Sequence, residues 1–442
     1  MRRRAQNKSS SFDGGNYMTI EPLEECTISF THDVKYTKDG ELWRNLKALL
    51  ELTLSKGKLY YFKSTIEKSW RCRVNITGKF NLRGNCMSLI FGDNAKGKYD
   101  LSEYIYVFQN SFTGSNVVEV EKTFLPATIL SHGCYNSMFS GCTSLTTAPE
   151  LPATTLVENC YSDMFSSCTS LVNAPELPAT ALANYCYRDM FRGCTSLTTA
   201  PSILSATTLA ENCYYSMFQD CTNLITAPEL PATTLAKYCY YSMFQNCTSL
   251  TTAPELPATS LVDDYCYYCM FRGCTKLNYI KMLATDIPFG SCLSGWVENV
   301  ASAGTFVKNP EATWDKVGVS GVPSGWTVKF DGEEDDSIET TLQFPLYIYF
   351  DECESLWVNT TCYADGDFSE LKRYLIECAE RYGTKVDDYR YMDEEAISQI
   401  GEIYIEDERL NTLVYYYGMD EINYSTATYI GFISATLIDG NK

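Results

Sequence analysis

Residues 239–261 read CYYSMFQNCTSLTTAPELPATSL, and closely related stretches occur five more times in the chain. The signature Cys-Tyr-x-x-Met-Phe opens at Cys134, Cys160, Cys186, Cys213, Cys239 and Cys266, at steps of 26 or 27 residues. Repeats of this length are typical of solenoids, in which each unit buries its apolar face against its neighbours. We therefore expect residues 84–287 to form a repeat solenoid.

The signature predicts a helix when it is placed on a helical wheel. At 100° per residue, Cys239, Tyr240, Met243, Phe244 and Cys247 fall within one arc of about 140°. The next residues, 249–253, have strand chemistry and are followed by prolines, which cannot donate to a central ladder. Each repeat is thus expected to be a helix, a short parallel strand and a proline-punctuated return.

Twelve cysteines recur in the repeats as a structural ladder. They are Cys134, Cys142, Cys160, Cys168, Cys186, Cys194, Cys213, Cys221, Cys239, Cys247, Cys266 and Cys274. Partners eight residues apart on a helix would be separated by about 12 Å, whereas a disulfide needs Cα atoms within about 7 Å. Helices of adjacent repeats pack about 8–10 Å apart, and C-x7-C is not a zinc pattern. We expect buried, reduced thiols and no metal site; a metal or disulfide ladder is the alternative.

The third residue of the signature varies between repeats and falls on the solvent side of the wheel. The candidate ligand-binding residues are Tyr215, Tyr241 and Tyr268, with Arg188 at the equivalent place and Arg192 and Arg272 nearby. Helix packing would set the three tyrosines about 10 Å apart in a row. Tyrosine and arginine are enriched in binding hot spots, so a host surface glycan or protein is the expected partner. Ordinary half-exposed surface is the alternative.

The repeat sequence resembles the BspA-like branch of leucine-rich repeats, which occurs in surface proteins of gut bacteria and in phages of those bacteria. The resemblance rests on the run quoted above and covers Cys134 to Ile287. It implies a binding or assembly scaffold and names no ligand. The sequence therefore predicts an α+β protein, a leucine-rich-repeat solenoid between an N-terminal antiparallel β domain and a C-terminal acidic α+β domain.

The expected domain boundaries follow from changes in composition. Residues 1–17 are a basic arm, 18–83 a β domain with alternating apolar residues, 84–287 the solenoid, 288–330 its C-terminal cap, 331–341 an acidic linker and 342–442 an acidic α+β domain. In the last domain we expect a strand at 344–350, a helix from Asp367 and further strands near its end. A calcium loop is the alternative for the linker, but the ligand spacing of an EF-hand is missing.

Charge and composition exclude several classes of function. The formal net charge of −20 lies almost wholly in residues 331–442, the acidic linker and the acidic C-terminal domain, and no domain has the basic surface that general nucleic-acid binding needs. Only His32 and His132 occur, and there is no phosphate loop or nucleophile elbow, so we expect neither an enzyme nor a cofactor. No apolar stretch is long enough to span a bilayer.

Two functions remain for a non-catalytic protein of this kind. The first is a virion component of a phage, a fibre, decoration or receptor-contacting protein, made in the host cytoplasm and assembled with other virion proteins. The second is a bacterial cell-surface adhesin. An adhesin is expected to carry an export signal and an anchor, which the sequence lacks. We therefore expect the virion role, with the basic arm and the acidic domain as assembly contacts.

Overall fold

The computed structural model describes residues 12–65, 71–261, 265–287, 291–332, 341–350, 354–363, 404–405, 412–414 and 432–434. The chain divides into two compact units, Met1–Glu333 and Glu334–Lys442. The basic residues of the expected N-terminal arm, Arg2 to Lys8, and the helix expected from Asp367 lie outside the described residues.

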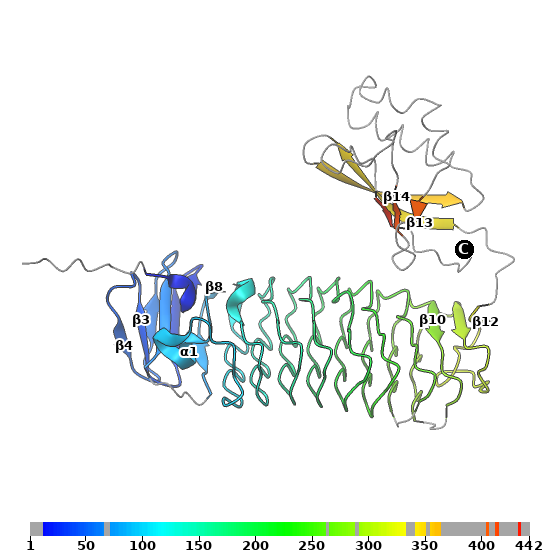
Figure 1. The fold of residues 1–442 in the computed structure, drawn as a ribbon, viewed down its shortest axis with the longest axis horizontal. Coiled ribbons are helices and arrows are strands. Elements are labelled where there is room, and N and C mark those ends of the chain that lie inside the picture. The colour runs from blue at the N-terminus through cyan, green and yellow to red at the C-terminus, as the bar shows by residue number, and fades with distance from the viewer. Residues whose placement is uncertain are drawn as a thin grey trace, which may run out of the picture. The chain divides into compact units, whose positions relative to one another are not determined.

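The first unit begins with short strands that form two sheets (Figure 1). These strands are β1 Met18–Pro22, β2 Cys26–Phe30, β3 Val34–Thr37, β4 Arg44–Leu46, β5 Leu52–Leu54, β6 Tyr60–Ser64, β7 Val74–Ile76, β8 Lys79–Arg83 and β9 Asn116–Val120. One sheet has the order β4-β3-β6-β1-β8-β9 and the other β5-β2-β7. Neighbouring strands are antiparallel except for β8 and β9, which are parallel and so join this region to the repeats.

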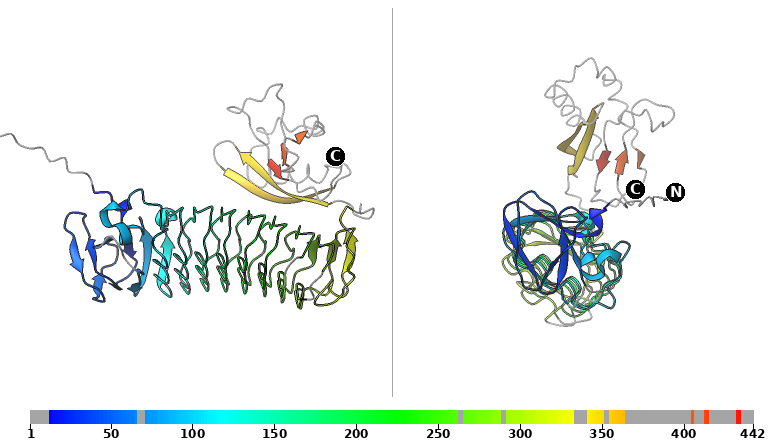
Figure 2. Two further views of the ribbon diagram at one scale, coloured as in Figure 1. Left: turned by 60° about the horizontal axis from the view of Figure 1, so that its bottom comes forward. Right: turned by 90° about the vertical axis from the view of Figure 1, so that its left-hand side faces the viewer.

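The repeats follow as a row of stacked coils (Figure 2). We call the segments that begin one residue before Cys134, Cys160, Cys186, Cys213, Cys239 and Cys266 coils 1 to 6, and the segment that begins one residue before Cys292 coil 7. Backbone hydrogen bonds set the register between coils, because every second N–H of the signature donates to the next coil, as Phe244 does to the carbonyl of Met270 at 2.9 Å. Equivalent residues therefore lie directly above one another.

The signature of each repeat is a run of turns and not the helix that the wheel predicted. The N–H groups that do not reach the next coil bond back by three residues, as from Met243 to the carbonyl of Tyr240 at 3.2 Å. Every fourth residue has a positive φ; in coil 5 these residues are Tyr238 (58°), Ser242 (51°) and Asn246 (61°). An α-helix needs a φ near −63° throughout and bonds to the fourth residue back, so this backbone cannot be one.

The predicted α+β class is therefore wrong. Within the described residues, regular α-helix is confined to α1, Ser88–Phe91, with three single-turn 3-10 helices: η1 Gly14–Asn16, η2 Gly92–Asn94 and η3 Lys122–Phe124. The predicted leucine-rich-repeat solenoid, with one helix and one parallel strand per coil, is also wrong. On the expected strand side, neighbouring coils are joined mainly by isolated parallel bridges, such as Thr199 with Thr226. Among the described residues of coils 1 to 6, only coil 6 supplies a strand to a sheet, β10 Tyr279–Met282.

Aromatic columns run through the interior of the coils. The inner tyrosine column consists of Tyr135, Tyr161, Tyr187, Tyr214, Tyr240 and Tyr267, with adjacent ring centroids 5.8 or 5.9 Å apart and planes within 10° of parallel. The phenylalanine column consists of Phe112, Phe139, Phe165, Phe191, Phe218, Phe244 and Phe271, with spacings of 5.5–5.8 Å. Both columns are buried, so the core has the same composition in every coil.

The twelve ladder cysteines are all buried in this core. Helix geometry does not account for this, because the coils contain no helix. The second cysteine of each coil also hydrogen-bonds: the Cys221 thiol donates to the Phe191 carbonyl of the preceding coil at 3.1 Å. The same contact recurs at 3.0–3.1 Å from Cys142, Cys168, Cys194, Cys247 and Cys274. These six sulfurs therefore act as weak donors between coils, besides filling space.

The first unit ends in a parallel sheet of β10 Tyr279–Met282, β11 Thr305–Lys308 and β12 Thr327–Phe330. Three tryptophans pack there and bond to the backbone through their indole N–H groups. Trp296 donates to Gly321, Trp314 to Ala284 and Trp326 to Ala301, at 2.7–2.9 Å. These contacts tie the last coils to the chain that follows them.

The described part of the second unit is one sheet. Its strands are β13 Thr341–Phe350, β14 Glu354–Tyr363, β15 Tyr404–Ile405, β16 Thr412–Val414 and β17 Phe432–Ser434, in the order β14-β13-β17-β16-β15. Every neighbouring pair is antiparallel. The α+β domain expected here is therefore corrected to a β-sheet for the residues that the structure describes.

Candidate ligand-binding surface

The structure stacks the three predicted tyrosines into one column on the surface of coils 4 to 6. We call Tyr215, Tyr241 and Tyr268 the outer tyrosine column. The ring centroids of Tyr215 and Tyr241 are 4.5 Å apart with planes within 4°, and those of Tyr241 and Tyr268 are 4.6 Å apart within 11°. The predicted spacing of about 10 Å is wrong, because hydrogen-bonded backbones approach much more closely than packed helices do.

A second pair of rings lies beside this column and was not predicted. Tyr238 and Tyr265 stack at 5.1 Å. Tyr238 lies edge-on to Tyr241 at 5.9 Å, and the Tyr265 ring is tilted against Tyr268 at 5.6 Å. Both residues directly precede the first cysteine of their coil, so the same comparison of equivalent positions could have found them. Five half-buried tyrosines thus form one aromatic surface.

Arg188 in coil 3 covers one end of the outer column. Its guanidinium carbon lies 5.2 Å from the centroid of Tyr215 and 6.0 Å from that of Tyr185. Since Arg188 occupies the position equivalent to Tyr215, its planar cation continues the column by one layer.

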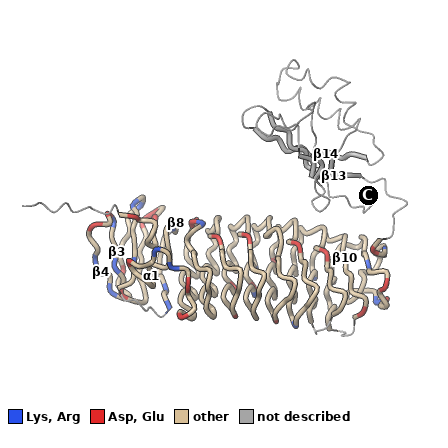
Figure 3. Tube along the Cα trace, viewed as in Figure 1, with Lys and Arg blue, Asp and Glu red and all other residues tan. Residues whose placement is uncertain are grey.

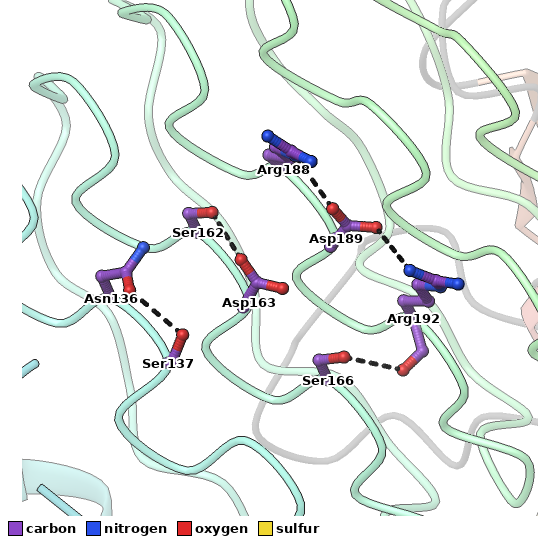
Figure 4. A network of polar contacts seen from close by, with 8 residues as sticks. All are labelled: Asn136, Ser137, Ser162, Asp163, Ser166, Arg188, Asp189 and Arg192. Carbon is purple, nitrogen blue, oxygen red and sulfur yellow. Dashed lines mark hydrogen bonds and ion pairs between the residues drawn. The ribbon is translucent and has the colours of Figure 1, made fainter. Parts of the chain in front are cut away.

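Asp189 holds both arginines of coil 3 in a polar network (Figure 4). Its carboxylate lies 3.0 Å from Nε of Arg188 and 3.7 Å from a terminal nitrogen of Arg192. The Asp189 side chain is only 6% exposed, while the side chains of Arg188 and Arg192 are 45% and 51% exposed. Sequence reasoning missed this residue because nothing in the repeat pattern marks Asp189 as buried.

Burial raises the pKa of the Asp189 carboxyl, and the nearby Asp163 carboxylate raises it further. The two arginines act in the opposite direction but do not cancel this effect, since their half-exposed charges are screened by water. Burial is also the main cause of the raised pKa of Tyr215 and Tyr241. The phenols of the column are therefore neutral at physiological pH.

Arg272 in coil 6 has a carboxylate partner in coil 7. Its Nε lies 2.9 Å from Oε2 of Glu298. All three arginines predicted to contact a ligand thus already pair with a carboxylate. The surface therefore offers guanidinium groups and aromatic rings with little unbalanced charge. Figure 3 shows that charged residues are sparse along the coils compared with the N-terminal strands.

Stacking determines which parts of the tyrosines can meet a ligand. Both faces of the Tyr241 ring are covered by Tyr215 and Tyr268, so its exposed surface is its edge and hydroxyl. A tyrosine in the middle of the column therefore offers no ring face to a ligand. Aromatic faces are available only where a column ends.

The two histidines lie away from this surface. Just before coil 1, Nε2 of His132 lies 2.5 Å from the Tyr106 hydroxyl, and Nδ1 lies 3.6 Å from Oε2 of Glu158. His32 is half-buried, but both of its ring nitrogens are buried and lack a hydrogen-bond partner. In the part of the chain that the structure describes, no group of three His, Cys, Asp or Glu side chains is placed to hold a metal ion.

The thiol of Cys269, the residue after Tyr268, does not reach this surface. Cys269 is 4% exposed, and burial raises the pKa of its thiol. Across the described ranges, the structure contains no helix with the length and apolar character needed to span a bilayer.

Searches among known protein families, curated proteins and solved structures found no match to this chain.

Proposed function

We propose that this chain is a non-catalytic binding and structural protein of a phage particle, and that the aromatic surface of coils 3 to 6 contacts a molecule on the host cell. The observation that carries the proposal is the outer tyrosine column, in which three successive coils place tyrosine at one surface position and Arg188 extends the stack. Nothing in the core requires aromatic residues there, since coils 1 and 2 carry Asn136 and Ser162 at the equivalent position.

Rigidity supports a role in recognition. The rings are held by their neighbours and by a backbone whose N–H groups bond from coil to coil, so little side-chain freedom would be lost when a ligand binds. Tyrosine and arginine are also the residues most enriched among those that dominate binding energy.

Buried thiols support synthesis in a reducing compartment. The sulfurs of Cys142, Cys168 and Cys194 are free, fully buried and engaged in hydrogen bonds to backbone carbonyls. A protein that folds after export meets oxidising conditions, in which a chain with 20 cysteines is exposed to wrong disulfide pairing. Together with the sequence resemblance to BspA-like repeats of gut bacteria and their phages, this favours a virion component over a bacterial adhesin.

Cell binding tests the proposal. The labelled full-length protein should bind intact host bacteria, and replacing Tyr215, Tyr241 and Tyr268 together with serine should abolish most of that binding. The matched control replaces Thr207, Thr233 and Thr259 with alanine, three exposed residues from the same stretch of coils. Equal binding by the tyrosine variant and the parent would refute the assigned surface.

Proteomics locates the protein. Peptides of this chain should appear in gradient-purified phage particles. Their presence in the bacterial envelope fraction and absence from particles would replace the virion assignment with the adhesin.

A further inference from the structure

The outer tyrosine column has one covered end and one open end. Arg188 covers the outer face of Tyr215 in coil 3. At the other end, the Cys269 N–H donates to the Ser294 carbonyl at 3.1 Å, which places Ser294 of coil 7 in register with Tyr268. Among the described residues, no aromatic ring or cation lies over the second face of Tyr268. A small side chain therefore stands where the next layer of the column would be.

The surroundings of this open face combine a second ring with polar groups. The Tyr265 ring lies 5.6 Å from that of Tyr268 and is tilted by 57°. Arg272 and Glu298 form an ion pair at 2.9 Å, and each stands four residues after Tyr268 or Ser294 in its own coil. An aromatic platform is thus bordered by a guanidinium and a carboxylate, both partly exposed.

Charge balance selects the class of ligand. Because Arg272 is already neutralised by Glu298, an anionic group would have to break this pair or face its carboxylate. A neutral sugar matches the site better. The apolar C–H face of a pyranose can lie on a tyrosine ring, while its equatorial hydroxyl groups can accept from the guanidinium and donate to the carboxylate.

We propose that the open face of Tyr268, above Ser294 and beside the Arg272–Glu298 pair, is a stacking subsite for one neutral pyranose ring of a host surface glycan. The sugar would form the fifth layer after Arg188, Tyr215, Tyr241 and Tyr268. This inference rests on the proposed function, because it assigns the ligand class of the same surface.

Saturation-transfer NMR with the full-length protein tests the subsite, with methyl β-D-glucopyranoside and methyl β-D-galactopyranoside as probes. At least one probe should receive saturation on the C–H protons of one ring face. Ser294→Tyr should weaken binding about two- to tenfold, since it fills the fifth layer with the protein's own ring, and Tyr268→Leu should weaken it by a similar factor. Tyr268→Phe, which keeps a ring under the sugar, and Thr233→Ala, a control at an exposed position outside the tyrosine column, should bind like the parent. The comparison of Tyr268→Leu with Tyr268→Phe tests the subsite even if Ser294→Tyr fails to fold.

Three results would overturn the subsite. They are no saturation transfer to either probe, unchanged binding by Tyr268→Leu, or an equal loss of binding in the control Thr233→Ala. Treating host cells with periodate should abolish binding of the protein, and treating them with protease should not; the reverse pattern would replace the glycan with a protein receptor. If cells bind the parent and not the triple tyrosine variant, yet the subsite variants behave like the parent, the proposed function stands and the subsite does not.

Discussion

The phenylalanine column predicts a defined energetic cost when one ring is removed from its middle. Phe218 is fully buried, and its ring centroid lies 5.5 Å from that of Phe191 and 5.7 Å from that of Phe244. Phe218→Ala leaves a cavity and should lower the free energy of unfolding by about 3–5 kcal/mol. Phe218→Leu keeps most of the buried apolar area but loses two aromatic contacts worth about 0.5–1.5 kcal/mol each, so we expect a loss of about 1–3 kcal/mol.

Urea unfolding measures both costs, with Ile225→Ala as the control. Ile225 lies in the same coil but is 57% exposed, so its replacement should change stability by less than about 0.5 kcal/mol. Far-UV circular dichroism reports on the whole chain. Tryptophan fluorescence reports in large part on the end of the column, because three of the six tryptophans, Trp296, Trp314 and Trp326, lie there and the Trp296 ring is 6.0 Å from that of Phe271. Comparing the two signals shows whether the coils unfold together. A Phe218→Leu variant as stable as the Ile225→Ala control would refute a contribution from ring stacking.

Three further predictions follow from the same structure. Met243→Asp should prevent the coils from folding, because Met243 is fully buried and a carboxylate there has no partner. Gln245→Asp, at a half-buried surface position, should lower stability only slightly, and circular dichroism of the two variants distinguishes these outcomes. The pKa of Asp189 lies above its ordinary value of 3.8 in the folded state, so this carboxyl binds more protons in the native than in the unfolded protein and lowers stability as the pH rises through that window. The melting temperature of Asp189→Asn minus that of the parent should therefore increase from acidic to neutral pH, and a constant difference would contradict this. Deleting residues 1–11 should leave the melting temperature unchanged but impair incorporation into particles, which sedimentation measures. The deletion stops before Phe12 because this ring packs against Tyr17 and Tyr61.

The sequence pattern identified the inward residues of the repeat but not the backbone that carries them. Cys239, Met243 and Cys247 are spaced by four residues, and on a helix each step of four drifts by only about 40°, so a wheel and a run of four-residue turns place the same side chains inside. The distinguishing signal lay at the positive-φ positions. Coil 2 carries Asn159, Asp163 and Ser167 there, four residues apart, and asparagine and aspartate are among the residues that tolerate a left-handed conformation best.

The surface column could be predicted in composition but not in geometry. Equivalent positions in the repeats identified Tyr215, Tyr241 and Tyr268. The distance between their rings could not be predicted, because it depends on whether side-chain packing or backbone hydrogen bonding sets the spacing of the coils. Hydrogen-bonded backbones bring the rings within 4.6 Å, so each ring covers its neighbour. The pKa of Asp189 depends on Asp163 in the preceding coil as well as on the arginines of its own coil, and no spacing rule contains that information.

The uniform interior of the coils has a consequence for how such a chain can change in length. Adjacent coils bury the same tyrosine, phenylalanine and cysteine side chains in register, so one coil can pack on any other. Unequal recombination between the near-identical coding segments would add or delete about one layer without creating a mismatch inside. Each such event would lengthen or shorten the row of outward side chains by one, including the outer tyrosine column. Duplication could therefore alter the extent of the contact surface in a single genetic step, with no new core to evolve.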